Sequence, residues 1–203
     1  HAAAGTPIDR SPVLRLLSSI ADFVDGRGYE AGAALVRHPD LAASIGRHSK
    51  ETAGATWLDA LDEYFNAHLP AHLPPRKASA GNGGTAPVFA LLQALDRPEF
   101  LGRLSGTRPL HQWMPEITGL LVDIYGGHEL DLSRPANRRI VEAAQRVRSA
   151  ALELMHLPRD VDEPTDSATA IRLLIDELAE VSLAPDPDRD AVELLGWLEL
   201  RLD

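Results

Sequence analysis

Two histidines near the middle of the chain have a spacing that could bind zinc. His68 and His72 are four residues apart, and on a helix this spacing places two side chains on one face, as a zinc site on a helix requires. Pro70 lies between them and breaks the helix that the pair would need. We therefore exclude a zinc site at these histidines.

Three aspartates toward the C-terminal end alternate as they do in a calcium-binding loop. They are Asp186, Asp188 and Asp190. Pro185 and Pro187 stiffen the same stretch into an extended linker, no glycine stands at the turn position, and no glutamate closes a twelve-residue loop. The sequence therefore predicts no metal site here.

The stretch Gly81-Asn-Gly83-Gly84 resembles a loop that binds phosphate. It follows no expected strand, and it lacks the Gly-Lys-Ser/Thr ending through which such loops reach phosphate and magnesium. The chain also has no interpretable Ser-His-Asp arrangement, no Asp…Glu-x-Lys nuclease core and no cysteine. We expect it to have no catalytic centre, so alone it should neither hydrolyse ATP nor cut DNA. A metal-dependent hydrolase is disfavoured because its histidines would be scattered.

His38 is the histidine that most invites a catalytic or metal-binding role, since imidazole is a common ligand and proton shuttle. No acidic residue or second histidine stands at ligand spacing from it. Pro39 disfavours helical geometry at the residue before it. We therefore interpret His38 and Pro39 as a structural break between two helices.

Five arginines lie along the helix that is predicted from Ser133 to about Leu157, and they are the best candidates for contacting a phosphate backbone. Glu142 and Glu153 are interleaved with them, and a solvated helix face of mixed charge needs no ligand. Both interpretations stay open at this point. The five candidates for DNA binding are Arg134, Arg138, Arg139, Arg146 and Arg148.

Charge is unevenly distributed over the 203 residues. Residues 160–203 hold 3 Lys and Arg against 13 Asp and Glu, whereas residues 1–159 hold 17 of each, so the C-terminal part carries the whole net charge of −10. Nucleic-acid-binding surfaces are normally basic, so any DNA contact should come from residues 1–159. With 44% hydrophobic residues and no signal peptide or apolar run long enough for a membrane span, we expect a soluble cytoplasmic protein without membrane partners.

Helical periodicity and helix-capping residues recur along the chain and predict a mainly α protein, an irregular helical bundle. The expected parts are an N-terminal helical part over 1–73, a flexible Pro/Gly linker over 74–87, a second helical part over 88–183, and an acidic linker with a truncated strand over 184–203. Ser11-Pro12 is a helix-opening pair, and Asp166 or Ser167 should cap the last helix. In the helix over Leu110–Tyr125 we expect the regular part to begin at Pro115.

The C-terminal stretch favours one short strand over 191–195, ended by Gly196. A lone strand leaves its backbone groups unpaired, and no second convincing strand is visible in the sequence. We therefore expect the strand to continue into a sheet of a larger protein, of which this chain is an internal fragment.

The stretch Val192-Glu-Leu-Leu-Gly196-Trp-Leu-Glu199-Leu-Arg-Leu-Asp203 resembles a conserved line of AddB/RecB-type helicase-nuclease subunits, bacterial proteins of the PD-(D/E)XK nuclease family. Near the other end, Gly5-Thr-Pro-Ile-Asp-Arg-Ser11-Pro12 and the later His38-Pro39 are similar to the run that opens the helical insertion called 2B in the same proteins. Gly196 and Glu199 would then stand at the Gly-Leu-Glu motif of the second motor domain.

The resemblance implies a helical accessory domain of a DNA double-strand-break-repair helicase-nuclease subunit, one that guides or scans DNA and has no catalytic centre. ATP and magnesium would serve the parent complex and not this fragment, and the partners would be DNA, through the parent complex, and a helicase-nuclease partner subunit. Around Gly196 the sequence departs from an active helicase motif, which puts in doubt whether this motor half couples ATP hydrolysis to movement. The alternative is a non-enzymatic α-helical protein-interaction module without a DNA role.

Overall fold

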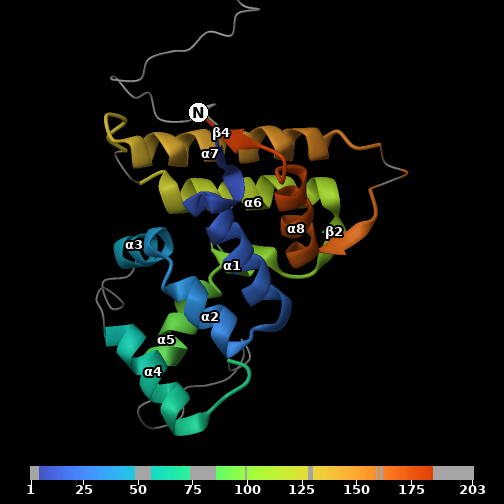
Figure 1. Ribbon diagram of the computed structural model, residues 1–203. Helices are drawn as coiled ribbons and strands as arrows, with labels where there is room; N and C mark the ends of the chain where they lie inside the picture. Colours follow the sequence, from blue (N-terminus) through green and yellow to red (C-terminus); the bar gives the residue numbers. More distant parts are fainter. Residues whose placement is uncertain are drawn as a thin grey trace, which may run out of the picture.

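Eight α-helices make up most of the described chain (Figure 1). The computed structural model describes residues 5–48, 56–73, 86–98, 100–127, 130–158, 160 and 162–184. The helices are α1 (Pro12–Gly26), α2 (Tyr29–Val36), α3 (Pro39–His48), α4 (Thr56–His68), α5 (Ala86–Leu95), α6 (Leu110–Tyr125), α7 (Pro135–Met155) and α8 (Ser167–Glu177). Two short 3-10 helices, η1 (Ile8–Arg10) and η2 (Leu101–Leu104), accompany them. The prediction of a mainly α protein is confirmed.

Helix α1 lies at the centre of the packing and contacts α2, α7 and α8 (Figure 1). Ser11 accepts the backbone N–H of Leu14 through its hydroxyl at 3.3 Å, and Pro12 occupies the first helical position, so the predicted helix start is confirmed. Its apolar stripe is fully buried, each member being at most 2% exposed: Val13, Leu14, Leu16, Leu17, Ile20, Ala21 and Phe23. One continuous core joins residues from both predicted helical parts.

Helix α3 docks against the C-terminal end of α6. The hydroxyl of Tyr125 donates to Asp40 at 2.7 Å, and the guanidinium of Arg47 donates to the carbonyl oxygen of Ile124 at 2.7 Å. Burial, with the neighbouring Asp40 carboxylate, raises the pKa of Tyr125 far above its ordinary value, so its phenol stays protonated. Both ends of α3 are thus tied to α6.

Helices α6 and α7 run side by side in opposite directions (Figure 1). Helix α6 begins at Leu110, so the start that we expected at Pro115 is wrong and that proline lies inside the helix. The helix can begin early because the Asp162 carboxylate, distant in sequence, accepts the backbone N–H of His111 at 3.1 Å and also pairs with its imidazole. Burial raises the pKa of Asp162, but the hydrogen bonds and positive charge of His111 outweigh it and leave that pKa below its usual value.

Four very short strands form two separate antiparallel pairs, and three of them come directly before a helix. Strand β1 (Thr6–Pro7) pairs with β4 (Ser182–Leu183), and β2 (Thr107–Pro109) pairs with β3 (Pro164–Asp166). The sequence predicted none of them, because segments of two or three residues are too short to show alternation and β1, β2 and β3 also contain proline. The one strand that we did expect, over 191–195, lies outside the described residues.

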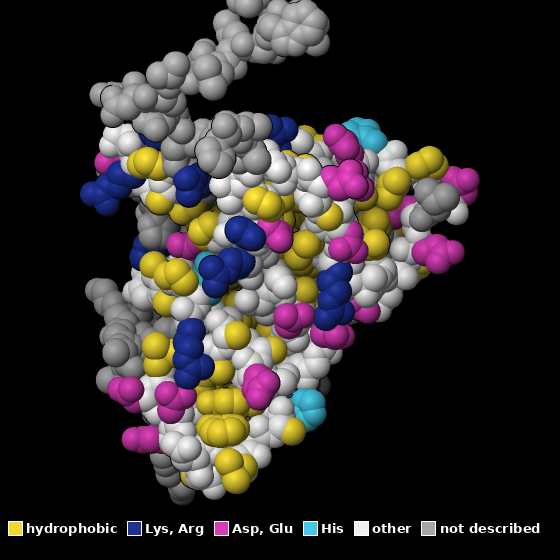
Figure 2. Space-filling view, viewed as in Figure 1, with side chains coloured by type: hydrophobic (Ala, Val, Ile, Leu, Met, Phe, Trp, Pro, Cys, Tyr) yellow, Lys and Arg dark blue, Asp and Glu magenta, His cyan; other side chains and the backbone are white. Residues whose placement is uncertain are grey.

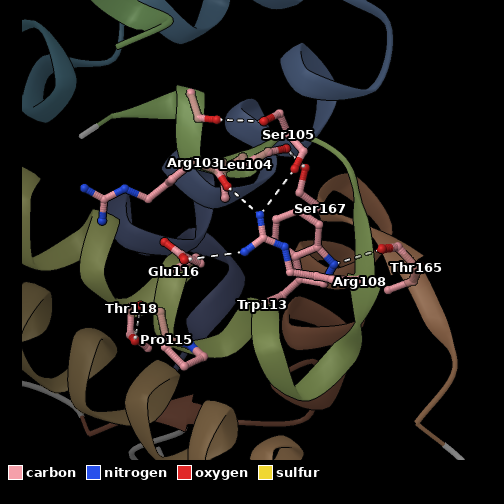
Figure 3. A network of polar contacts seen from close by, with 11 residues as sticks. Arg103, Leu104, Ser105, Arg108, Trp113, Pro115, Glu116, Thr118, Thr165 and Ser167 are labelled. Atoms are coloured by element: carbon pink, nitrogen blue, oxygen red, sulfur yellow. Dashed lines mark hydrogen bonds and ion pairs between the residues drawn. The ribbon is translucent and has the colours of Figure 1, made fainter. Parts of the chain in front are cut away.

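Arg108 and Trp113 lie at the centre of a polar network that connects β2, α6 and β3 (Figure 3). The indole N–H of Trp113 donates to the carbonyl oxygen of Thr165 at 2.9 Å, and the Arg108 guanidinium stacks 4.1 Å from the centroid of the Trp113 ring. Ser167, the first residue of α8, donates its hydroxyl to the carbonyl oxygen of Leu104 at 2.7 Å. The other partners of Arg108 are two backbone carbonyls and one carboxylate, those of Arg103, Ser105 and Glu116.

Helices α4 and α5 pack on each other at the end of the molecule away from α7 (Figure 1). Tyr29 of α2 stacks on Phe65 of α4, with ring centroids 4.6 Å apart. Helix α5 begins at Ala86, so the predicted linker over 74–87 is too long by two residues at its end, and residues 74–85 lie outside the described part. Proline is tolerated in a first helical turn, which is why Pro87 did not mark the helix start correctly.

Candidate nucleic-acid interface

The N-terminal end of α7 is built by a tight loop that uses two of the five candidate arginines. Arg134 is the residue before the helix, its side chain is 76% exposed, and its Nε lies 3.5 Å from Asp131. Asp131 accepts hydrogen bonds from the side chain and from the backbone N–H of Ser133. These two hydrogen bonds hold the pKa of Asp131 below its usual value. Arg138 donates to the carbonyl oxygens of Leu132 and Ser133, both at 3.1 Å. Arg138 therefore supports the loop.

Arg139 and Arg146 are the two candidates that share one face of α7. They are seven residues apart, close to two turns of an α-helix, and both are exposed. Glu142 lies between them on the same side of the helix and accepts the backbone N–H of Ala184, just past β4, at 3.2 Å. The face that carries this pair therefore borders β4, which pairs with β1.

Arg148 lies on a different side of α7. It is exposed and lines an apolar groove between α6 and α7 together with residues such as Leu121 and Val122. At about 100° per residue, Arg148 is turned away from Arg139 and Arg146 by more than a right angle. The five arginines that were predicted together on one helix therefore lie in three places. Arg134 and Arg138 belong to the loop before α7, Arg139 and Arg146 share one face of the helix, and Arg148 lines the groove.

Two further arginines that were not among the sequence candidates lie on η1 and α1, the two helices that follow β1. Arg10 of η1 and Arg15 of α1 are exposed, and within the described ranges neither makes an ion pair. Figure 2 shows arginine side chains over α7, over the first part of α1 and over α2 on the side viewed. We name Arg10, Arg15, Arg139 and Arg146 the arginine face.

No pattern within η1 or α1 could have identified Arg10 and Arg15. Arg10 stands between Asp9 and Ser11 and Arg15 between two leucines, and the β1–β4 pairing that brings them near α7 joins residues from opposite ends of the described chain. Phosphate contacts need only exposed cations at suitable separations, without a sequence motif. The arginine face therefore offers positive charges of the kind that contact a sugar-phosphate backbone.

His38 lies at the break between α2 and α3, as predicted, and Pro39 is the first residue of α3. Its Nε2 lies 3.1 Å from the carbonyl oxygen of Pro12, and its buried Nδ1 has no partner among the described residues. Burial, with a contribution from Arg15, lowers the pKa of His38, although Asp40 opposes this. A neutral ring that donates through Nε2 fits this arrangement, and it supports a structural role.

The His38 ring should make the folded protein less stable at mildly acidic pH. Because its folded-state pKa is below the unfolded value of 6.5, the unfolded chain takes up a proton first, so stability should be constant above that pH and decrease as the pH falls through it. We expect the loss of Tm between pH 7.5 and pH 5.5 to be smaller in His38→Gln, because the glutamine amide can donate to Pro12 without titrating. Equal losses in both proteins would contradict this.

The remaining sequence candidates lie outside the arginine face. Gly196, Glu199 and the aspartates at 186, 188 and 190 lie outside the described residues. Within the described part, no three His, Asp or Glu side chains come together in a way that could hold a metal ion. His72 Nδ1 instead lies 3.1 Å from the carbonyl oxygen of Gly26.

No helix in the described ranges is both long enough and apolar enough to cross a membrane.

Comparisons with known proteins give no relative for this chain. A scan against models of protein families found no match, and neither a search of curated proteins nor a search of solved structures found a similar protein.

Proposed function

We propose that this chain is the helical accessory domain of a cytoplasmic helicase-nuclease subunit that acts in DNA double-strand-break repair, and that its arginine face guides the DNA backbone. ATP and magnesium would act elsewhere in the parent complex, alongside a partner subunit. The observation that carries the proposal is the exposed group formed by Arg10, Arg15, Arg139 and Arg146 on neighbouring elements. Exposed cations attract the phosphate backbone whatever the base sequence, which suits a protein that must follow DNA of any sequence.

The two ends of the described chain support the idea of an inserted domain. Thr6 pairs with Leu183 and Pro7 with Ser182, so the entering and leaving segments lie side by side. Gly5 belongs to the run that resembles the start of the 2B insertion, and a Cβ added to it would lie 2.3 Å from the Leu183 carbonyl oxygen. Domains whose ends meet can be inserted into a host domain with little disturbance.

The proposal predicts DNA binding that depends on the arginine face and on salt. We expect the double variants Arg139→Ala with Arg146→Ala, and Arg10→Ala with Arg15→Ala, to weaken binding of a short duplex. Each lost phosphate contact should also reduce the slope of log affinity against log salt by about 0.9 on duplex DNA. Fluorescence anisotropy titrations at about 50 mM and about 200 mM salt measure both effects.

The matched control is the double variant Arg97→Ala with Arg148→Ala. It removes the same charge from exposed positions outside the arginine face, so it should keep most of the affinity and the full salt slope. A chain that ends at residue 184, and so keeps α8 and β4, should bind more tightly than the full chain, because residues 185–203 hold 6 Asp and Glu against 2 Arg. Absence of binding at low salt, or equal losses in all three double variants, would argue against DNA guidance by this face.

The alternative function, an α-helical protein-interaction module, is favoured by one specific feature. The groove between α6 and α7 has a volume of about 330 Å³ and an almost wholly apolar lining. Val122, on its wall, is 67% exposed. Exposed apolar surfaces of this kind mark protein contacts more often than DNA contacts. An intact protein that binds no DNA but does bind a protein through this groove would support the alternative.

A further inference from the structure

The groove between α6 and α7 is an incomplete helix packing. Its walls are the second half of α6 with the glycine that follows it, from Thr118 to Gly126, and the middle of α7, from Ile140 to Arg148. On the other sides, α6 is covered by α3 and α8, and α7 by α1, α8 and β4. Among the described residues, no helix lies over the groove. Its apolar walls are formed by Leu121, Val122, Tyr125, Ile140, Ala144 and Val147.

One charge stands at this otherwise apolar groove. Arg148 is exposed and has no ion-pair partner within the described part of the chain. Thr118, also in the lining, already donates its hydroxyl to the carbonyl oxygen of Met114 at 2.8 Å. The groove therefore offers apolar surface together with one positive charge, and a carboxylate on the occupant would complement it.

The backbone of the walls decides which kind of segment can fill the groove. Both walls are α-helices, so their N–H and C=O groups are already paired within each helix. An extended segment would find no backbone partners there and would leave its own groups unpaired against apolar side chains. A helix satisfies its backbone internally and can pack its ridges into a groove between two helices.

We propose that the groove binds an amphipathic helix from another polypeptide, with an apolar face and a carboxylate that pairs with Arg148. Each wall spans about nine residues, or about 13 Å at the helical rise. A length of this size accommodates two to three apolar anchors of the occupant, spaced about four residues apart. The inference does not depend on DNA binding by the arginine face, because Arg148 lies outside that face.

A synthetic peptide tests the proposal directly. The probe is a fluorescein-labelled amphipathic helix with three leucines at positions i, i+4 and i+7 and a glutamate flanking them, and a second peptide carries lysine in place of that glutamate. We expect the full chain to bind the glutamate peptide at least tenfold more tightly than the lysine peptide in anisotropy titrations. The Arg148→Glu variant should reverse this preference, which a merely apolar contact would not do.

Two matched variants locate the binding site. Val122→Asp places a charge on the groove wall at a position that is 67% exposed, so folding should survive, and peptide affinity should fall at least tenfold. Leu173→Asp makes the same change on α8, where Leu173 is 43% exposed, and affinity should stay unchanged. Absence of peptide binding, or equal binding by both variants, would overturn the proposal. Self-association in sedimentation experiments that is lost only in Val122→Asp would also overturn it and assign the groove to a second copy of this chain.

Discussion

Replacing Trp113 with alanine should lower the free energy of unfolding by about 3–5 kcal/mol. Trp113 is 0% exposed and is the largest of the fully buried side chains. The substitution removes its apolar contacts, leaves a cavity, and releases both the carbonyl oxygen of Thr165 and the stacked guanidinium of Arg108. Because this network joins β2, α6 and β3, the loss should affect the whole core. Urea unfolding followed by circular dichroism at 222 nm measures it.

A second substitution at the same position separates packing from hydrogen bonding. Trp113→Phe keeps an aromatic ring in the core and removes the indole N–H that donates to Thr165, so it should cost distinctly less than the alanine variant. Leu173→Ala on the exposed side of α8 serves as the control and should change stability by less than about 0.5 kcal/mol. If Trp113→Ala unfolds at the same urea concentration as the unaltered protein, the packing described here is wrong.

Removing the Asp96 carboxylate should also be costly, at about 3 kcal/mol. Arg27 donates through Nη1 and Nη2 to the two carboxylate oxygens at 2.8 and 3.0 Å, and the two side chains are only 20% and 12% exposed. In Asp96→Ala the Arg27 guanidinium stays in place with its charge poorly solvated, and its buried Nε already lacks a partner in the described part. Thermal unfolding should show a clear fall in Tm.

A double-mutant cycle separates the stability that comes from the Arg27–Asp96 ion pair from the stability that each side chain contributes alone. When Arg27→Met and Asp96→Ala are combined, neither charge of the pair remains, so the double variant should be more stable than Asp96→Ala alone. Raised salt should not reproduce the effect of Asp96→Ala, since pairs with little exposure are weakly screened. Additive losses in the cycle would mean that the ion pair contributes nothing of its own.

The helices could be predicted because their signals are local. Ser11 caps α1 through its hydroxyl, and Asp166 caps α8 by accepting the N–H of Thr169 at 2.8 Å. The bounds of α6 agree with the helix predicted over Leu110–Tyr125, but its regular part begins before Pro115, because the Asp162 carboxylate, some fifty residues away, accepts the N–H of His111. The strands were missed for the same reason, since each consists of two or three residues held by a distant partner.

The candidate site, like the fold, could be predicted from the sequence only where the signals are local. Helical spacing alone already places Arg148 on a different side of the predicted helix from Arg139 and Arg146, so this part of the division can be predicted from the sequence. The hydrogen bonds of Arg138 depend on the irregular conformation of the preceding loop, and the position of Arg10 and Arg15 near α7 depends on the distant β1–β4 pairing. Local periodicity carries no information about such contacts.

The β1–β4 pair also determines how the domain would respond to mechanical load. Its two strands are antiparallel, and their outer ends, at Gly5 and Ala184, leave the pair on the same side. A force that separates these ends would break the hydrogen bonds one after another instead of all at once. The next bond inward, from the N–H of Ile8 to the carbonyl oxygen of Val181 at 3.0 Å, would yield before the helical core is strained. The pair would therefore act as a soft joint, which opens under tension at its two outer ends before that tension reaches the core.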